Sequence, residues 1–117
     1  MHEFSLMQGI LDSVTPVALQ NGATRVTSIT LDIGIMTQVV DECMDFAFEA
    51  LTDDDPLYKG AKLVMNFLEP KSRCLDCGAE YEHDRFHLKC PECGSSVTTL
   101  LQGKEMHIAS IEVETPD

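Results

Sequence analysis

Residues 74–94 read CLDCGAEYEHDRFHLKCPECG, and this stretch decides how the middle of the chain can fold. It contains two Cys-x-x-Cys pairs, Cys74 with Cys77 and Cys90 with Cys93, which are separated by twelve residues and are each followed by glycine. A glycine at this position permits the left-handed turn that directs backbone amides toward the sulfurs. Four thiolates at this spacing predict a closed tetrahedral site, which is typical of structural zinc and leaves no coordination position for a substrate.

Two other uses of paired cysteines stay open at this point. An iron site like that of rubredoxin resembles the CPECG half, although its two knuckles are usually much further apart. A redox Cys-x-x-Cys expects one pair in a thioredoxin-like βαβ context, which is missing from the surrounding sequence. Zinc is favoured because residues 71–103 contain few apolar side chains, so metal binding would have to supply the folding energy of this segment.

The segments on either side of the cysteines show the periodicity of an α+β fold. Apolar residues at three- and four-residue steps predict helices over residues 4–20 and 38–51, with Thr37 as the cap of the second. Pro16 predicts a kink or an early end in the first helix, and Cys43, on the apolar stripe of the second, is expected to be a buried small hydrophobe. Period-two patterns predict strands over residues 25–33, 61–68 and 105–114. We therefore predict two helices packed on a three-stranded sheet, with an inserted four-cysteine lobe of the zinc-ribbon type.

The charge of the chain restricts its partners. Eight basic and twenty acidic side chains give a formal net charge of −12, which is unfavourable for binding nucleic acid or an anionic membrane surface. No apolar run approaches the roughly 18 to 20 residues of a membrane span, and the first residues lack the basic and apolar regions of a secretory signal. We expect a cytoplasmic protein with no membrane span and no nucleic-acid partner.

The first three residues, Met1-His2-Glu3, form a candidate metal site of a different kind. The terminal amine of Met1 and the amide and imidazole nitrogens of His2 can close fused chelate rings in one plane, a geometry that suits Ni(II) or Cu(II). The amide or carboxylate of Glu3, or another histidine, could complete the plane. A frayed terminus without a role is the alternative reading of these residues.

Three further histidines are candidate accessory ligands or ordinary surface residues. His83 and His87 lie between the two cysteine knuckles, where they are either solvated loop residues or secondary metal ligands. His107 lies within the last predicted strand, and we expect it to be packed or hydrogen-bonded there.

Taken together, these motifs resemble the HypA/HybF family of nickel metallochaperones, which act in the maturation of NiFe-hydrogenases. The resemblance runs nearly end to end. Besides the opening tripeptide and both knuckles, it includes the segments ITLDIG (29–34), DFAFEAL (45–51), GAKL (60–63) and QGKEMHIASIEVE (102–114). The family usually has a glutamate after the glycine that ends the first strand, and this chain has Ile35 there.

The resemblance implies two metals with different roles. Nickel, a transient cargo, would bind at the amino terminus, with His2 as the essential ligand and Met1 and Glu3 as supporting positions. Structural zinc would be held by Cys74, Cys77, Cys90 and Cys93. The resemblance also implies delivery of nickel to the hydrogenase large subunit in company with the GTPase HypB, and some relatives supply urease as well.

On this interpretation, residues 1–69 plus 104–117 form a nickel-binding α/β domain, and residues 70–103 form an inserted zinc-binding domain. We find no nucleophile with a base, no glycine-rich phosphate loop and no open metal site, so we do not expect an enzyme. The alternative is a zinc-ribbon interaction or regulatory module without a nickel role, which explains the cysteines and the acidity but leaves the first three residues to chance. The sequence leaves open whether the chain forms a homodimer.

Overall fold

The computed structural model describes residues 2–116, which divide into two compact units. The first unit comprises residues 2–31, 39–66 and 107–116, and the second comprises residues 32–38 and 67–106. Residues 32–38 therefore belong with the cysteine-rich segment, whereas the sequence grouped them with the helices. The assignment of nickel and zinc to two separate domains stays a prediction.

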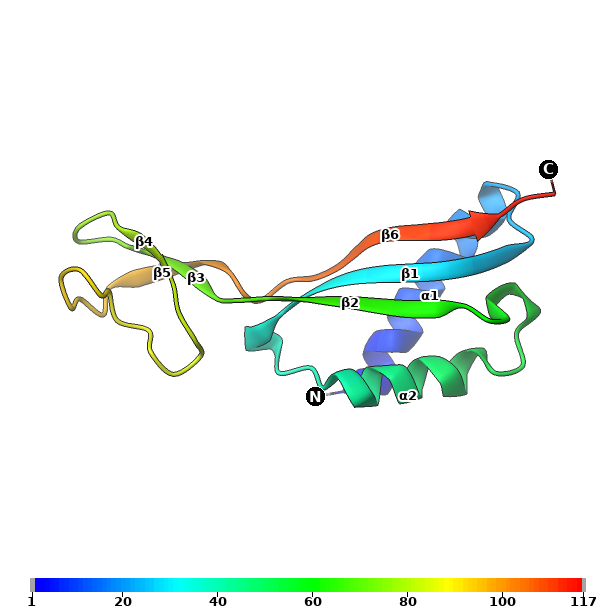
Figure 1. Cartoon of the computed structure of the whole chain (residues 1–117), viewed down its shortest axis with the longest axis horizontal. Helices are drawn as coiled ribbons and strands as arrows, with labels where there is room; N and C mark the ends of the chain where they lie inside the picture. Colours follow the sequence, from blue (N-terminus) through cyan, green and yellow to red (C-terminus); the bar gives the residue numbers. More distant parts are fainter. Residues whose placement is uncertain (1, 117) are drawn as a thin grey trace. The chain divides into compact units, whose positions relative to one another are not determined.

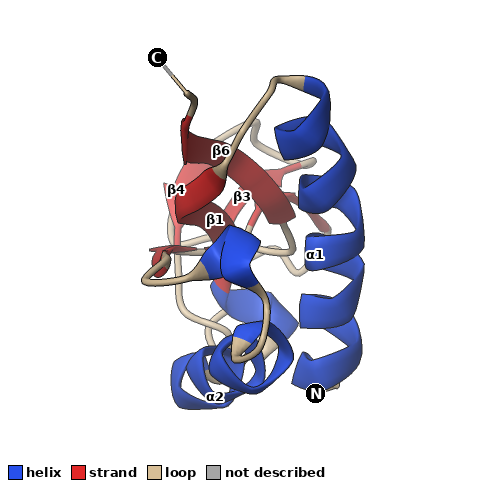
Figure 2. Ribbon diagram, turned by 90° about the vertical axis from the view of Figure 1, so that its right-hand side faces the viewer, coloured by secondary structure: helices blue, strands red, loops and turns tan. Residues whose placement is uncertain are grey.

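Both predicted helices and all three predicted long strands are present, in the order shown in Figure 1. The elements are α1 (Glu3–Gln20), β1 (Arg25–Gly34), the short 3-10 helix η1 (Ile35–Thr37), α2 (Asp41–Thr52), the 3-10 helix η2 (Pro56–Tyr58), β2 (Lys62–Leu68), β3 (Lys71–Cys74), β4 (Glu80–Glu82), β5 (Thr98–Gln102) and β6 (Met106–Glu114). The long strands form one sheet in the order β2-β1-β6, and both helices lie on the same side of it (Figure 2). The predicted α+β fold class is confirmed.

The first unit is held together by the apolar stripes of its two helices and the central strand. α1 and α2 pack against each other. The fully or nearly buried side chains of this unit include Met7, Leu11, Val14 and Ala18 of α1, Val26, Ile29 and Leu31 of β1, and Met44, Ala47 and Phe48 of α2. Burial of a large apolar side chain contributes roughly 1.5–3 kcal/mol, so this set supplies most of the unit's stability.

Pro16 does not end the first helix early, because α1 continues to Gln20. Proline removes one amide donor from the helix ladder, but Pro16 is exposed while Val14 and Ala18 on either side of it are buried. The buried stripe therefore keeps the helix intact past the proline. After the last turn, Asn21 donates its side-chain amide to the carbonyl of Val17 at 2.7 Å.

Two predictions about α2 were wrong. Thr37 does not cap this helix, because α2 begins at Asp41 and the residue before its first turn is Val40. The hydroxyl of Thr37 donates to the Gly34 carbonyl at 2.7 Å. Cys43 is exposed rather than buried. The stripe that faces the core runs instead through Met44, Ala47 and Phe48, so the helix is rotated from the orientation that the sequence pattern suggested.

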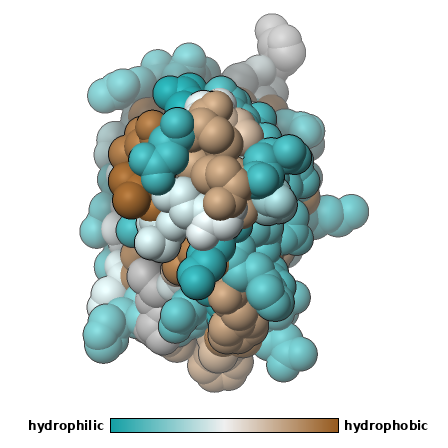
Figure 3. Space-filling model, turned by 90° about the vertical axis from the view of Figure 1, so that its left-hand side faces the viewer, coloured by the Kyte–Doolittle hydropathy of each residue, from teal (hydrophilic) through white to brown (hydrophobic). Residues whose placement is uncertain are grey.

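The second unit contains a small antiparallel sheet in the order β4-β3-β5, which the sequence did not predict. Among residues 71–102 only Ser72, Cys74 and Cys90 are buried, so this segment has no apolar core of its own. Figure 3, which views the molecule from the side where Figure 1 draws this sheet, shows apolar side chains scattered among hydrophilic ones at the surface. A fold with so little burial needs a covalent or metal crosslink.

None of the helices within residues 2–116 combines the length and the apolar character needed to cross a bilayer.

Candidate metal centres

The four cysteines of the two knuckles come together at one point in the second unit. Their sulfurs all lie within 4.8 Å of one another, and the Sγ atoms of Cys74 and Cys93 are 3.5 Å apart, as those of Cys77 and Cys90 are 3.6 Å apart. A tetrahedron with zinc–sulfur bonds of about 2.3 Å has edges of about 3.8 Å. A disulfide would require about 2.05 Å, and all four thiols are free. The spacing and the donor set therefore fit a single tetrahedral metal ion.

The backbone around each knuckle follows the same local pattern. The amide of Gly78 donates to the carbonyl of Cys74 at 2.9 Å, and the amide of Gly94 donates to that of Cys90 at the same distance. Both glycines have positive φ, 79° and 74°, a conformation that strains other residues. The first cysteine of each knuckle is buried and the second is exposed. Each pair therefore supplies one sulfur from a buried residue and one from a surface residue.

The pKa values of the thiols show how the site is prepared for a cation. The Cys77 amide, 3.5 Å from the sulfur, lowers the pKa of Cys74 to about 7. The Ser95 amide favours the thiolate of Cys93, but the bonds of this thiol with the neighbouring sulfurs, together with partial desolvation, raise its pKa to about 12. Four such groups cannot all ionise side by side without a cation between them. A bound divalent metal would remove that conflict.

The amino-terminal candidates lie in the first unit. Met1 is outside the described residues. His2 is exposed and directly precedes α1, where its carbonyl accepts the first helical bond, from the amide of Leu6 at 3.0 Å. The structure therefore leaves His2 exposed at the surface, immediately before α1.

Glu3 already has a structural task in this arrangement. Its carboxylate accepts a hydrogen bond from the amide of Val40 at 3.2 Å, and the Glu3 residue is 9% exposed. The pKa of Glu3 is lowered because the amide of Val40, and then its own amide, stabilise the carboxylate. Val40 precedes α2, so Glu3 fastens the start of α1 to the start of α2. Sequence reasoning, which considered Glu3 only as a ligand, missed this contact because no local pattern links residues 3 and 40.

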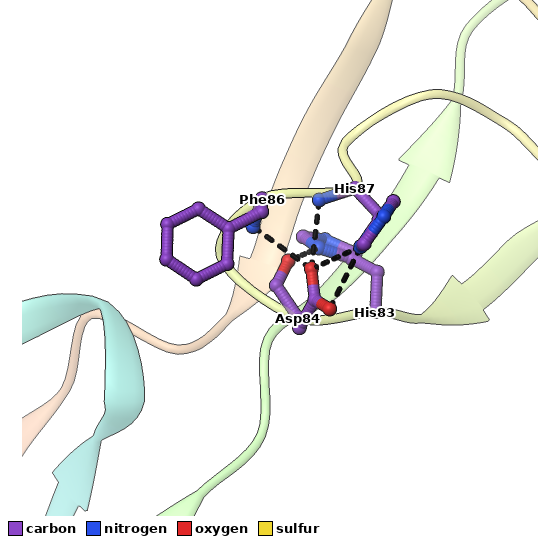
Figure 4. Close-up of polar contacts among 4 residues, drawn as sticks. All are labelled: His83, Asp84, Phe86 and His87. Carbon is purple, nitrogen blue, oxygen red and sulfur yellow. Dashed lines mark hydrogen bonds and ion pairs between the residues drawn. The ribbon is translucent and has the colours of Figure 1, made fainter.

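The two histidines between the knuckles differ in how many of their ring nitrogens are hydrogen-bonded. Figure 4 shows both rings beside Asp84. In His83, Nδ1 lies 2.6 Å from the Asp84 carbonyl, which can only accept, so this nitrogen carries the proton. Its Nε2 is 2.7 Å from the hydroxyl of the buried Ser72 and must accept from it in the neutral ring. Both nitrogens of His83 are therefore occupied within the protein.

His87 has one nitrogen that is still available. Its Nδ1 lies 2.7 and 2.8 Å from the two carboxylate oxygens of Asp84, which hold its proton there, while the His87 side chain is 82% exposed. Asp84 also accepts the amides of Phe86 and His87, and its pKa is lowered first of all by the bond from His87. A neutral His87 would direct the lone pair of Nε2 to solvent. His107, which we expected to be packed or hydrogen-bonded, is exposed on β6, so its predicted packing was wrong.

Among the described residues 2–116, the structure thus brings four cysteine sulfurs together in the second unit and leaves the imidazole of His2 exposed directly before α1. A family model described as hydrogenase/urease nickel incorporation, metallochaperone, hypA matches residues 1–113. The chain belongs to the HypA family. This family assignment confirms the resemblance drawn from the sequence motifs.

Individual HypA proteins match over nearly their whole length. The hydrogenase maturation factor HypA of Aquifex aeolicus is 34% identical over 114 residues, which cover 97% of this chain and 98% of that one. The factor of the same name from Geotalea uraniireducens is 37% identical over 114 residues, with 97% and 100% covered.

Two solved structures share the fold. The solution structure of the Ni metallochaperone HypA from Helicobacter pylori gives a TM-score of 0.70 at 23% identity, covering 98% of this chain and 99% of that one. A second HypA solution structure gives 0.74 at 23% identity, with 97% of each chain covered. At this identity the likeness establishes the fold, including the four-cysteine unit.

Proposed function

We propose that this HypA protein binds Ni(II) at its amino terminus and delivers it to the large subunit of a NiFe-hydrogenase. The observation that carries the proposal is the family match, which includes residues 1–3. The exposed position of His2 directly before α1 supports it. In this proposal the Met1 amine and the amide and imidazole of His2 supply three nitrogens in one plane.

Glu3 supports the site through its position. Because its carboxylate is bonded to the amide of Val40, we propose that it fixes where the terminus leaves the helix. A contribution of Glu3 to the nickel plane would then come from its backbone nitrogen. This division of roles leaves the nickel ligands at the chain end, where a partner can exchange them one at a time.

Delivery requires a site that holds nickel against loss and yields it to the recipient, which is a difference between two affinities. Ligands at an exposed chain end fit that requirement better than a cage in a core. We propose the GTPase HypB as the partner that accompanies delivery. The proposal needs no covalent bond in the cargo to be made or broken, so the protein acts as a carrier and not as an enzyme.

The four cysteines would hold structural Zn(II). Zinc would supply the crosslink that the poorly buried second unit lacks. Four protein ligands leave no position open, so nickel exchange would not pass through this site. Free thiols of this kind persist in a reducing compartment, and we propose that the protein works in the cytoplasm.

The test is a transfer experiment. Protein loaded with one equivalent of radioactive ⁶³Ni is mixed with nickel-free precursor of a hydrogenase large subunit, with and without HypB and GTP, and the two proteins are separated. The proposal predicts nickel in the large subunit from the native chain and far less from a His2→Ala variant. Equal transfer from free nickel salt and from the loaded native chain would contradict a carrier role.

A further inference from the structure

An open groove on the first unit combines exposed aromatic rings with carboxylates. It has a volume of about 460 Å³, and its walls include Phe4 of α1 and Glu42, Cys43 and Phe46 of α2. The rings of Phe4 and Phe46 meet edge to face with their centroids 6.0 Å apart, yet they are 47% and 65% exposed. Two adjacent aromatic side chains left this open to water are typical of an interaction surface.

The helix that carries Phe46 is strongly acidic. Its exposed carboxylates are Asp41, Glu42, Asp45 and Glu49, and between Arg25 and Lys59 the chain has no lysine or arginine. Asp41 with Asp45, and Asp45 with Glu49, are like-charge pairs four residues apart, a spacing that destabilises a helix. Negative charge at Asp41 and Glu42, in the first turn, favours the helix, but the pairs that involve Asp45 repel each other. A cation brought to the surface would relieve that repulsion.

The basic side chains on either side of this acidic stretch lie away from the groove. Arg25 donates to a carboxylate oxygen of Glu114 at 2.6 Å and to the carbonyl of Lys59 at 2.8 Å, so it is engaged within the protein. Lys59 lines a separate hollow with Asp45 and Glu49, and no lysine or arginine is among the described residues that line the groove. A cation at the groove would have to come from another molecule.

We propose that this groove is a docking site for a cationic segment of a partner protein, one that carries lysine or arginine beside an aliphatic or aromatic side chain. The apolar side chain would pack against Phe4 and Phe46. A guanidinium or ammonium group would pair with Glu42, which lines the groove, and with Asp45, which lies three residues further along α2 and outside the groove lining. The cation can also lie over the face of Phe46.

The negative charge of the chain argues against two other possible occupants of the groove, a second copy of the chain and a nucleic acid. A second copy of this chain carries the same net charge of −12 and would bring carboxylates to carboxylates. A nucleic acid is excluded by the same sign. A protein segment with both cationic and apolar side chains satisfies the two features of the groove together.

Docking of such a segment would require no metal. One consequence rests on the proposed function: His2 also lines the groove, so a docked segment would lie beside the proposed nickel ligands. Docking and transfer would then occur at the same surface.

The test uses a defined peptide, acetyl-GSRLKFRSG-amide, titrated into ¹⁵N-labelled, zinc-loaded and nickel-free protein. Two peptide controls replace either the basic residues by glutamate or the leucine and phenylalanine by serine. The protein variants are Phe46→Ser and the double variant Glu42→Gln/Asp45→Asn. The double variant Asp53→Asn/Asp54→Asn is the matched control, because it removes the same charge from exposed positions beyond the groove.

We expect chemical-shift changes centred on the groove, and binding weakened at least fivefold by Phe46→Ser and by Glu42→Gln/Asp45→Asn but less than twofold by the control. Equal weakening by both double variants would mean that the peptide is held by non-specific charge attraction. Binding that Phe46→Ser leaves unchanged would show that the peptide does not bind in the groove. Absence of binding at millimolar peptide, or self-association of the protein that Phe46→Ser abolishes, would also overturn the proposal. Since no nickel is present, failure here and failure of the nickel site are separate results.

Discussion

Replacing Gly34 by alanine should destabilise the second unit, because two backbone segments meet there at the closest approach that glycine permits. A Cβ atom at Gly34 would lie 2.1 Å from the carbonyl carbon and oxygen of Gly103 and 2.5 Å from the amide nitrogen of Lys104. Ordinary contact begins near 3.4 Å, so the segments would have to separate by about 1.3 Å.

The separation would also break hydrogen bonds. The amide of Gly34 donates to the carbonyl of Glu105 at 2.8 Å, and that of Met36 donates to the carbonyl of Gly103 at 2.7 Å. Overpacking costs about 1–3 kcal/mol and each lost bond about 1 kcal/mol, so the free energy of unfolding should fall by roughly 3–5 kcal/mol. The assay is urea denaturation of the zinc-loaded protein, followed by far-UV circular dichroism and by zinc release.

The matched control is Gly9→Ala. Gly9 lies on the exposed side of α1, and a Cβ there would meet nothing within 4 Å. Alanine should therefore stabilise that helix by roughly 0.5–1 kcal/mol. A loss below about 1 kcal/mol in Gly34→Ala, or equal losses in both variants, would show that the contact between Gly34 and Gly103 is not as close as described.

Three further predictions concern titration and hydrogen bonding. The folded pKa of Glu3 is lowered from 4.5, so its contact with Val40 stabilises the fold above that pH and is lost as the pH falls through the lowered value; the Val40 amide shift should titrate below pH 4.5 in the native protein and not in Glu3→Gln, and a midpoint above 4.5 would contradict the contact. Zinc binding to the metal-free protein at pH 7 should release more than about two protons, because the pKa of Cys77 is raised and that of Cys93 is about 12. Calorimetry in buffers of different ionisation enthalpy measures the number of protons released. A zinc affinity that does not weaken on acidification would refute the assignment of the four thiols as ligands. His83→Ala should destabilise the second unit by about 1–3 kcal/mol because it leaves the buried Ser72 hydroxyl without its partner; His87→Ala, at an exposed ring, should have a much smaller effect on zinc release in urea, and the reverse order would be inconsistent with the bonding described.

The first unit could be predicted from the sequence because its pattern and its burial agree. Met7, Leu11, Val14 and Ala18 recur at helical steps and are buried as one stripe, and Ile29 and Leu31 alternate in β1 and are buried on one face. Pattern reasoning failed for Cys43, because α2 has apolar residues on both its buried and exposed faces. Exposed Phe46 made the stripe ambiguous.

The small sheet of the second unit could not be predicted in the same way. β3, β4 and β5 are three to five residues long and show no apolar alternation, since Lys71, Arg73 and Glu80 lie among them. Their pairing follows from the two knuckles, which bring Cys74 opposite Thr98 and Arg73 opposite Glu80. The cysteine spacing predicted the cluster itself, because that spacing alone limits where the sulfurs can go.

The contacts of polar side chains were predictable only where they are local. Asp84 with His87 is a three-residue spacing that turns favour, and the sequence displays it. The bonds from Ser72 to His83 and from Val40 to Glu3 join residues 11 and 37 positions apart. These two hydrogen bonds depend on the tertiary fold, so no local sequence motif predicts them.

The proposed carrier function depends on nickel binding at the amino terminus. A nickel titration of three zinc-loaded proteins measures this binding: the native chain, His2→Ala and a chain with two extra residues before Met1, with zinc counted in each. We expect about one nickel for the native chain, severe weakening in both variants and one zinc in all three. Equal nickel binding by all three proteins would show that the terminal nitrogens do not hold the metal.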